Sequence, residues 1–423
     1  MDDLRREKSP RRVAVVGAGI AGLSTAWFLQ EHGIEVTVLD RIGVAAGASW
    51  GNAGWLMAGD ATPLPSPEVF REGLRGLLGR SPVLRVPLFG DPGLYRFLMH
   101  FARHCTSAQW ERSLRALIPV SSRALDAYDS FADGGVAVTS TLSTNHLTLF
   151  TSTAGQDAYV RHLEHLRELG SQTEFAVMDA HEARDASPLT SPAVVGAVGL
   201  RGQRYIDPTA FVPSLAESVL ARGGAIESSV DVRAVRDLGG AVEVLVNTQA
   251  VTRVLRCDAV VVCTGAWLGE LVGRFGVRVP VRAGRGYSFS AALDVDVTDP
   301  IYLPSAHLAC TPMRGRLRIA GTMEFRSPTA PMDPTCVDAM VAAARQVLQG
   351  VDLDDRRDLW VGPRPVTADG RPLVGPTRSP RIWCVGGHAM EGMVLGPATA
   401  KLASEALVSG VVPELLRPFD PVR

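Results

Sequence analysis

The sequence predicts an α/β protein in which a Rossmann-like domain is interleaved with an α+β domain built on an antiparallel sheet. Two observations carry this prediction. Residues 13–40 show the pattern strand, glycine-rich turn, helix, strand, and similar strand-and-turn signals return at 258–266 and 382–388. The segments 136–207 and 277–330 are instead rich in short β-type runs. The two domains therefore alternate along the chain.

Length and composition agree with two folded domains. The chain has 423 residues, more than one hydrophobic core ordinarily serves, and a net charge of −1. That charge lacks the basic excess typical of nucleic-acid binding. The start is charged, and the longest apolar run, Ala259–Leu268, is far shorter than the roughly 18 residues of a membrane span. The six cysteines form no CxxC pair. We expect a cytoplasmic protein with reduced, buried thiols and no metal site.

The first unit carries the most informative glycines. After the strand Val13–Val16, Gly17 allows a tight turn, Gly19 lets the backbone approach a pyrophosphate, and Gly22 lets the helix pack closely on the strand. The helix N-terminus offers free N–H groups to phosphates. Asp40 ends the second strand, where an acid typically binds a ribose hydroxyl. The unit predicts a bound dinucleotide and leaves FAD and NAD both open.

The next segment, Gly47–Gly54, reads GASWGNAG. An enzyme that binds NAD alone would continue its sheet here with another helix and strand. Small residues instead suit a backbone lying against a flat flavin ring, and Ser49 and Asn52 offer polar groups to the ring edge or the phosphates. This pattern favours FAD. A surface loop is the alternative, although Trp50 and Trp55 make a bare solvent loop less attractive.

Later segments complete the expected organisation. Residues 208–222 read as a helix, 230–256 as strands with a Gly239-Gly240 hairpin that extends the first sheet, and 396–408 as a helix. We expect the FAD-binding domain in 10–60, 208–270 and 356–423, and the substrate-binding domain in 61–207 and 271–355, with a helical insert at 63–130.

At this point the chain resembles a known family. GAGIAGLSTAWFLQEHGIEVTVLD, followed by GASWGNAG, is similar to the D-amino-acid dehydrogenase and glycine oxidase family of FAD-dependent, DAO-type amine oxidoreductases. The resemblance covers nearly the whole chain. It continues in PVRAGRGYSFS (280–290), GRLRIAGTME (315–324), GPRPVTADGRPLVG (362–375) and GGHAMEGMVLGPATA (386–400). The middle motifs favour the dehydrogenase branch.

The resemblance implies three catalytic candidates. Arg364 falls where the family places the arginine that clamps the substrate carboxylate, a task suited to a planar guanidinium. Tyr287 is expected to line the pocket and His388 to approach the flavin. The structural alternatives are a surface arginine beside two prolines, a half-buried strand tyrosine and a packed turn histidine.

The resemblance also implies a glutathione-reductase-like FAD fold of the D-amino-acid oxidase type. Its last helix, expected from near Gly396, would point a positive dipole end at the flavin. Since residues 356–372 hold no Cys and 41–59 no His, we expect non-covalent FAD. The cofactor-binding residues so expected are Gly17, Gly19, Gly22, Asp40, Arg41, Ser49, Asn52, Ala53, Gly54, Thr264, Gly265, Gly387, Gly392 and Met393.

The sequence departs from glycine oxidases just after Gly387-His388. They carry a second arginine there, whereas this chain has Ala389-Met390-Glu391. A bulkier, cyclic or cationic amine therefore becomes an attractive substrate, with Glu391 facing its positive end.

The implied reaction is oxidation of the C–N bond of an amino or imino acid, a D-amino acid first. Hydride transfer to flavin N5 gives an imine, which is hydrolysed to a keto acid and ammonia or retained if cyclic. The acceptor is oxygen, a quinone or a carrier. Residues 69–104 mix Arg with Leu and Phe, a pattern that suits peripheral contact with the inner membrane face or ordinary helix packing. The alternatives are an oxygen-using oxidase of a biosynthetic pathway, an NAD(P) enzyme and a flavin-binding scaffold subunit.

Overall fold

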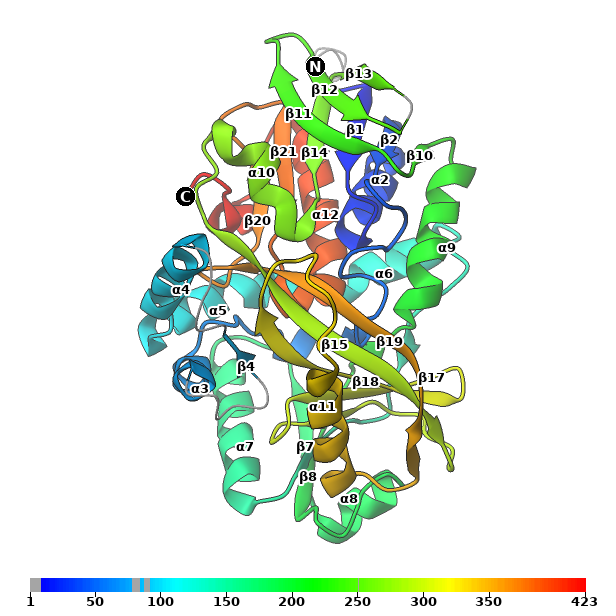
Figure 1. Cartoon of the computed structure of the whole chain (residues 1–423), viewed down its shortest axis with the longest axis vertical. Coiled ribbons are helices and arrows are strands. Elements are labelled where there is room, and N and C mark those ends of the chain that lie inside the picture. Colours follow the sequence, from blue (N-terminus) through cyan, green and yellow to red (C-terminus); the bar gives the residue numbers. More distant parts are fainter. Residues whose placement is uncertain (1–8, 78–83, 87–91, 250) are drawn as a thin grey trace.

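The computed structural model describes residues 9–77, 84–86, 92–249 and 251–423. A mainly parallel sheet forms one half of the molecule, in the order β10-β2-β1-β14-β21-β20 (Figure 1). β2, β1, β14 and β21 are parallel neighbours, and β20 pairs antiparallel with β21 at the edge. These strands are β1 (Arg12–Val16), β2 (Glu35–Leu39), β10 (Ala225–Glu227), β14 (Ala259–Val262), β20 (Leu373–Pro376) and β21 (Ile382–Gly386).

The parallel sheet is covered on both faces, which explains why its central strands are continuously apolar. In β1, Val13 and Val15 pack with helices α2 (Ile20–Glu31) and α12 (Gly392–Ser409). Ala14 and Val16 point the other way, into a core shared with β11 and β12. The alternation of side chains along one strand therefore builds both layers.

One expectation about this half was wrong. The Gly239-Gly240 hairpin forms, but it does not extend the first sheet. It belongs to a separate antiparallel sheet, β11-β12-β13, that lies on the face of the parallel sheet. Val235, Val242 and Val244 are buried there, while alternate residues face outwards. Its strands are β11 (Asp231–Asp237), β12 (Val242–Asn247) and β13 (Thr252–Cys257).

A large mixed sheet forms the other half, in the order β19-β15-β18-β17-β16-β6-β8-β7, with β4 paired to β18. The long strands β15 and β19 run diagonally from this half towards the first (Figure 1). Its strands are β4 (Leu84–Arg85), β6 (His146–Phe150), β7 (Glu174–Asp179), β8 (Gly196–Arg201), β15 (Val281–Leu293), β16 (Ile301–Leu303), β17 (Leu308–Met313), β18 (Arg316–Phe325) and β19 (Val351–Thr367). A small third sheet holds β3 (Trp55–Leu56), β5 (Thr141–Leu142) and β9 (Arg204–Tyr205).

The position of β19 moves one expected boundary. We expected the nucleotide-binding part to resume at residue 356, yet residues 356–367 pair with β15 in the second sheet. The chain returns to the first sheet only at β20. The division into two domains otherwise stays a prediction.

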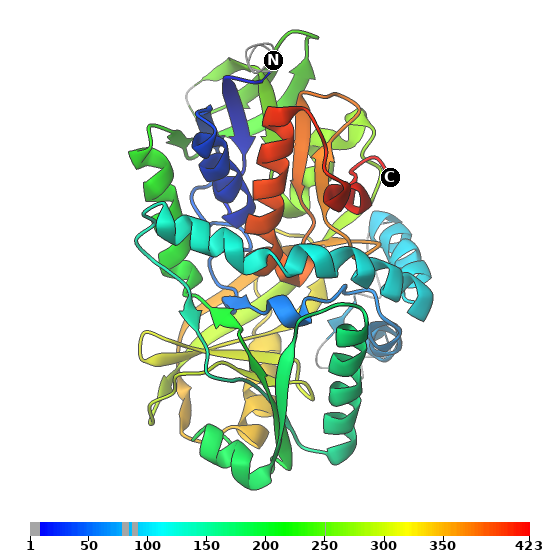
Figure 2. The same cartoon turned by 180° about the vertical axis from the view of Figure 1, so that it is seen from behind.

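Helices fill the expected insert and the flanks. In Figure 2, which shows the molecule from behind, the cyan helices of residues 107–133 cross the near side between its two halves. None of the helices in the described ranges is both long and apolar enough to cross a membrane. The remaining helices are α3 (Pro67–Leu77), α4 (Pro92–His104), α5 (Ser107–Ser121), α6 (Ala124–Asp133), α7 (Thr153–Glu168), α8 (Ala180–Ala186), α9 (Pro208–Ala221), α10 (Leu268–Val272) and α11 (Pro334–Val347).

Candidate active site

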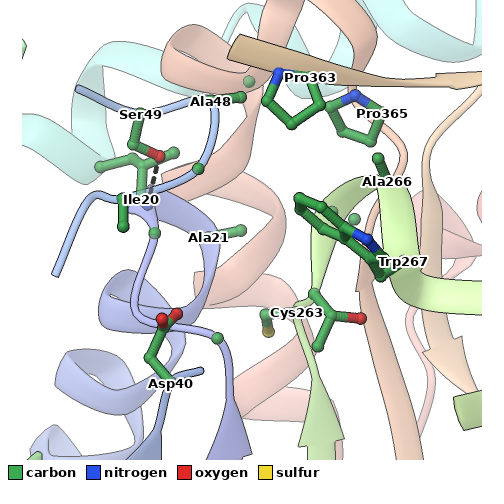
Figure 3. Close-up of a pocket in the computed structure, with 18 of the residues that line it drawn as sticks. Ile20, Ala21, Asp40, Ala48, Ser49, Cys263, Ala266, Trp267, Pro363 and Pro365 are labelled. Carbon is green, nitrogen blue, oxygen red and sulfur yellow. Dashed lines mark hydrogen bonds between the residues drawn. The ribbon is translucent and has the colours of Figure 1, made fainter. Parts of the chain in front are cut away.

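A large open cavity lies where the carboxyl ends of the parallel strands meet β19 (Figure 3). Together with its open mouth, which includes bulk solvent space, it holds about 1440 Å³ free of protein atoms. Figure 3 shows Asp40 at one end and Pro363 and Pro365 at the other. Ligands of open α/β sheets bind at this edge, so the position is the expected one for a dinucleotide.

The glycine turn shapes the first part of the cavity, and two of its three glycines, Gly17 and Gly22, are sterically required. Gly17 has φ 113°, and a Cβ there would lie 2.6 Å from the carbonyl oxygen of Cys263. A Cβ on Gly22 would lie 1.8 Å from the carbonyl oxygen of Gly17. Gly19 is the N-cap of α2 and has no side chain to cap the helix. The Ile20 N–H is bonded to Ser49 Oγ, so the N–H groups of Ala21 and Gly22 are the ones left to bind phosphate oxygens, which fits a bound pyrophosphate.

Ser49 and Asn52 line the cavity but already have protein partners. Ser49 Oγ accepts a hydrogen bond from the N–H of Ile20 at 3.0 Å, the dashed line of Figure 3. Asn52 donates to the carbonyl of Ser49 and accepts from the N–H of Gly54. Their first role is to fold this loop onto the start of α2.

Asp40 and Arg41 lie at the end expected for a ribose. Asp40 accepts from the N–H groups of Ala18, Ile42 and Gly43, at 2.8–2.9 Å. A carboxylate has about four acceptor positions, so one is left for a ligand hydroxyl. Arg41 lies over the ring of Trp267, 4.6 Å from its centre. Both residues line the cavity.

The close approaches in the GASWGNAG stretch are to protein rather than to the cavity. A Cβ on Gly51 would lie 2.2 Å from the Trp360 ring, and one on Gly54 would lie 1.9 Å from the carbonyl oxygen of Ile206. Gly54 and Ala53 are absent from the cavity lining given by the described residues. Ala53 instead accepts a hydrogen bond from Thr311 Oγ1 at 2.7 Å. The cofactor contacts expected of these two positions stay a prediction that the cavity lining does not support.

The wall opposite the glycine turn combines expected and unexpected residues. Thr264 and Gly265 line the cavity as expected, directly after β14. Trp267 and Trp360 line it too, and the sequence analysis missed both. Each follows or precedes a recognised motif by a few residues, but a lone Trp gives no periodic signal. Burial raises the pKa of the Cys263 thiol, also in the lining, to about 12 and so keeps it protonated.

Arg364 lies in the lining on β19. Its Nη1 donates to the carbonyl of Thr322 at 2.7 Å, and among the described residues no carboxylate lies within ion-pair distance of it. Burial lowers the pKa of Arg364 to about 10, which still leaves the guanidinium charged at neutral pH. An uncompensated, partly buried cation facing a cavity is a strong anion site.

The C-terminal motif closes the cavity. His388 is 5% exposed, and its Nε2 lies 2.8 Å from Thr399 Oγ1. Gly392 and Met393 line the cavity at the start of α12, one turn earlier than the expected start near Gly396. The positive end of this helix therefore faces the cavity. Gly387 is outside the lining, although its neighbours on both sides are in it, because its φ of 77° turns it towards Thr367.

Two further residues lie away from the main cavity. Tyr287 was expected to line it, but its side chain is fully buried in the core of the second sheet, with its hydroxyl donating to Glu324 at 2.7 Å. In this arrangement Tyr287 does not line the main cavity.

Glu391 lines a smaller cavity, together with His388 and Met390. Burial, with the Asp60 charge adding to it, raises the pKa of Glu391 to about 8.

Comparison with known proteins agrees with this geometry. Residues 12–406 match the family described as DAO, FAD dependent oxidoreductase. The chain is 30% identical over 416 residues to a D-amino acid dehydrogenase of Cereibacter sphaeroides, covering 96% of this chain and 93% of that protein. Glycine oxidase from Geobacillus kaustophilus has a similar structure, with a TM-score of 0.73, 21% identity and coverage of 98% and 99%.

The FAD-bound L-α-glycerophosphate oxidase of Mycoplasma pneumoniae shares the fold, with a TM-score of 0.72, 14% identity and 94% coverage of both chains. The three glycines of the turn and the N–H groups at the start of α2 suit the pyrophosphate of FAD. This chain belongs to the DAO family of FAD-dependent oxidoreductases.

Proposed function

We propose that this enzyme oxidises the C–N bond of an amino or imino acid, a D-amino acid first, and that Arg364 binds the substrate carboxylate. The observation that carries the proposal is the guanidinium of Arg364, which lines the cavity without an acidic partner in the described ranges. The name of the Cereibacter relative supports the amino-acid class.

The chain's contribution to this reaction is mainly positional. Bound FAD supplies the hydride acceptor. Arg364 fixes the carboxylate through paired charge-assisted hydrogen bonds, which orients the α-carbon. The positive end of α12 and the buried walls stabilise negative charge that develops beside Gly392. Hydrolysis of the resulting imine gives a keto acid and ammonia, and a cyclic imine persists.

Glu391 gives no direct support for a cationic substrate. It lies in the smaller cavity, beyond the residues that line the main one. No second arginine follows His388, so Arg364 is the single carboxylate clamp that we propose. We therefore propose that apolar or cyclic amino acids fit better than glycine.

The first test is spectroscopic. The purified enzyme should show flavin absorbance that bleaches on anaerobic titration with D-amino acids or proline-like imino acids. Flavin that L- and D-amino acids both leave oxidised would favour the scaffold alternative. Acid precipitation should release the flavin, because the proposed attachment is non-covalent.

The second test is Arg364→Leu. This variant should keep FAD and lose roughly 100-fold or more in kcat/KM for amino acids, since it removes the charged partner of the carboxylate. Arg357→Leu is the matched control, because Arg357 lies on the same strand, is exposed and is outside the cavity lining. Equal kinetics for the two variants would contradict the carboxylate assignment.

For the electron acceptor we propose a quinone or carrier at a membrane surface, with oxygen as the alternative. Helices α3 and α4 expose Phe70, Leu74, Tyr95 and Met99, in i, i+4 pairs next to arginines. Such a surface suits a peripheral location at the inner face of a membrane. Co-sedimentation with vesicles of anionic lipid, compared with Phe70→Ser/Met99→Ser, tests this assignment.

A further inference from the structure

We infer that Gly286 and Thr322 form a β-bulge that positions the guanidinium of Arg364, an inference that rests on the proposed carboxylate-binding role. Neither residue lines the cavity, and neither is among the site residues expected from the sequence. Both act through Arg364 and are positioning residues rather than catalytic ones.

The bulge is visible in the pairing of β15 with β18. Arg285 pairs with Glu324, and Tyr287 pairs with Gly321. A single residue of β15, Gly286, therefore faces two residues of β18, Thr322 and Met323. A bulge of this kind bends its strand and redirects a group, and bulges are frequent beside active sites.

Thr322 shows what the bulge redirects. Its φ is 59°, in the left-handed region that a β-branched residue rarely adopts. This strained conformation directs the Thr322 carbonyl to Nη1 of Arg364, at 2.7 Å. Backbone strain of this kind persists where the surrounding structure enforces it, often at functional sites.

Gly286 supplies the space that the guanidinium occupies. A Cβ at Gly286 would lie 2.1 Å from both Cζ and Nη2 of Arg364, and 2.5 Å from Nη1. On its other side, Gly286 pairs with Gly362 of β19, two residues before Arg364. The guanidinium therefore lies directly against the bare backbone of Gly286, with Nη1 bound to the Thr322 carbonyl.

A buried ion pair fixes both ends of the bulge. Glu324 accepts a hydrogen bond from the Tyr287 hydroxyl at 2.7 Å and pairs with Nη1 of Arg285 at 3.1 Å. Arg285 also donates to the carbonyls of Ala330 and Pro331. Arg285 and Tyr287 flank Gly286 directly. Their side chains and that of Glu324 are buried. Tyr287 therefore contributes to the site from behind it.

The experiment uses Gly286→Ala in the FAD-loaded enzyme. The new methyl group would displace the guanidinium, the flexible end of a long side chain, so the variant should fold and retain FAD. The dissociation constant of propionate, a carboxylate without an amine, is measured through the flavin absorbance. We expect it to rise at least about tenfold, together with KM for the amino acid. Gly240→Ala is the control, because a Cβ there meets nothing within 4 Å.

A double variant identifies the cause. In Arg364→Leu/Gly286→Ala, the alanine should add no further loss, because the group that it displaces is gone. Should Gly286→Ala alone fail to load FAD, this double variant should load it as Arg364→Leu does. A double variant that fails in the same way would overturn the inference.

The remaining outcomes separate this inference from the proposed function. Unchanged propionate binding in Gly286→Ala, with weakened binding in Arg364→Leu, would overturn the positioning role and leave the carboxylate site intact. Unchanged binding in Arg364→Leu would overturn both. An additive loss in the double variant would show that Gly286 acts independently of Arg364, which also overturns the inference.

Discussion

Arg364 and His388 line the same cavity, and burial lowers the pKa of both, but with opposite results for charge. The pKa of Arg364 falls to about 10, so it stays cationic at neutral pH. The pKa of His388 falls to about 4, so the imidazole is neutral there. Thr399 donates its hydroxyl to carbonyls of α12, so His388 donates Nε2–H to Thr399. Arg364 therefore presents a cation to the cavity, and His388 presents a neutral imidazole.

This neutral histidine predicts a pH effect on stability. In the unfolded chain, imidazole binds a proton near its ordinary pKa of 6.5, whereas in the fold it does so near 4. Between pH 6.5 and pH 4, unfolding therefore takes up a proton on His388. The stability that the neutral imidazole contributes is fully present above pH 6.5 and is lost as the pH falls towards 4. His388→Gln should remove up to about 2 kcal/mol of the stability difference between pH 7 and pH 5.

Urea unfolding of both holoenzymes at the two pH values measures this difference. His146, which burial also keeps neutral, is present in both proteins and cancels in the comparison. Identical pH profiles for wild type and His388→Gln would show that His388 titrates normally and is not held neutral by burial.

Among the elements, helix α2 depends most directly on one position. A Cβ on Gly22 would lie 1.8 Å from the backbone oxygen of Gly17, and no side-chain movement relieves a clash with backbone. Gly22→Ala must shift the helix from β1 and disturb the glycine turn. We expect a loss of about 3 kcal/mol or more in unfolding free energy, together with loss of bound flavin.

The absorbance ratio of flavin to protein after purification and the urea midpoint measure the two effects. Gly240→Ala, in the exposed turn between β11 and β12, should match wild type in both. A yellow Gly22→Ala enzyme with unchanged stability would contradict the packing role assigned to Gly22.

The sequence predicted where helices and strands lie better than it predicted which surfaces and residues they contact. The strand, turn and helix at 12–31 follow from local rules that glycine spacing and apolar runs express directly. The β11–β12 hairpin was also predicted, but alternation along its strands gives one buried face without saying which surface covers it. Gly51 and Gly54 indicated close backbone approach correctly, yet spacing cannot distinguish a ring of Trp360 from a ring of a cofactor. Tyr287 shows the same limit, because a motif fixes its strand and not its neighbours.

At the scale of the whole molecule, the Gly47–Gly54 loop joins the two halves. Ser49 holds the start of α2, while the carbonyl of Gly51 accepts from Ser288 of β15 at 2.6 Å. Arg318, buried on β18, lies 5.3 Å from the centre of the Trp50 ring. One loop thus links the glycine turn to the sheet that carries Arg364. The cavity is lined by both halves, so its ligand should stabilise both.

Removing FAD tests this link between the halves. Gly17 and Asp40 of one half and Trp360 of the other face the same cavity, so the apoenzyme should lose stability in a single transition that includes both sheets. Adding FAD at 100 times its Kd should restore about 2.7 kcal/mol. Thermal melts followed by far-UV circular dichroism and by tryptophan fluorescence measure the change, with Gly22→Ala as a control that FAD should not rescue. Two separate transitions, with FAD moving one alone, would show that the cofactor is held by one half and that the loop does not couple them.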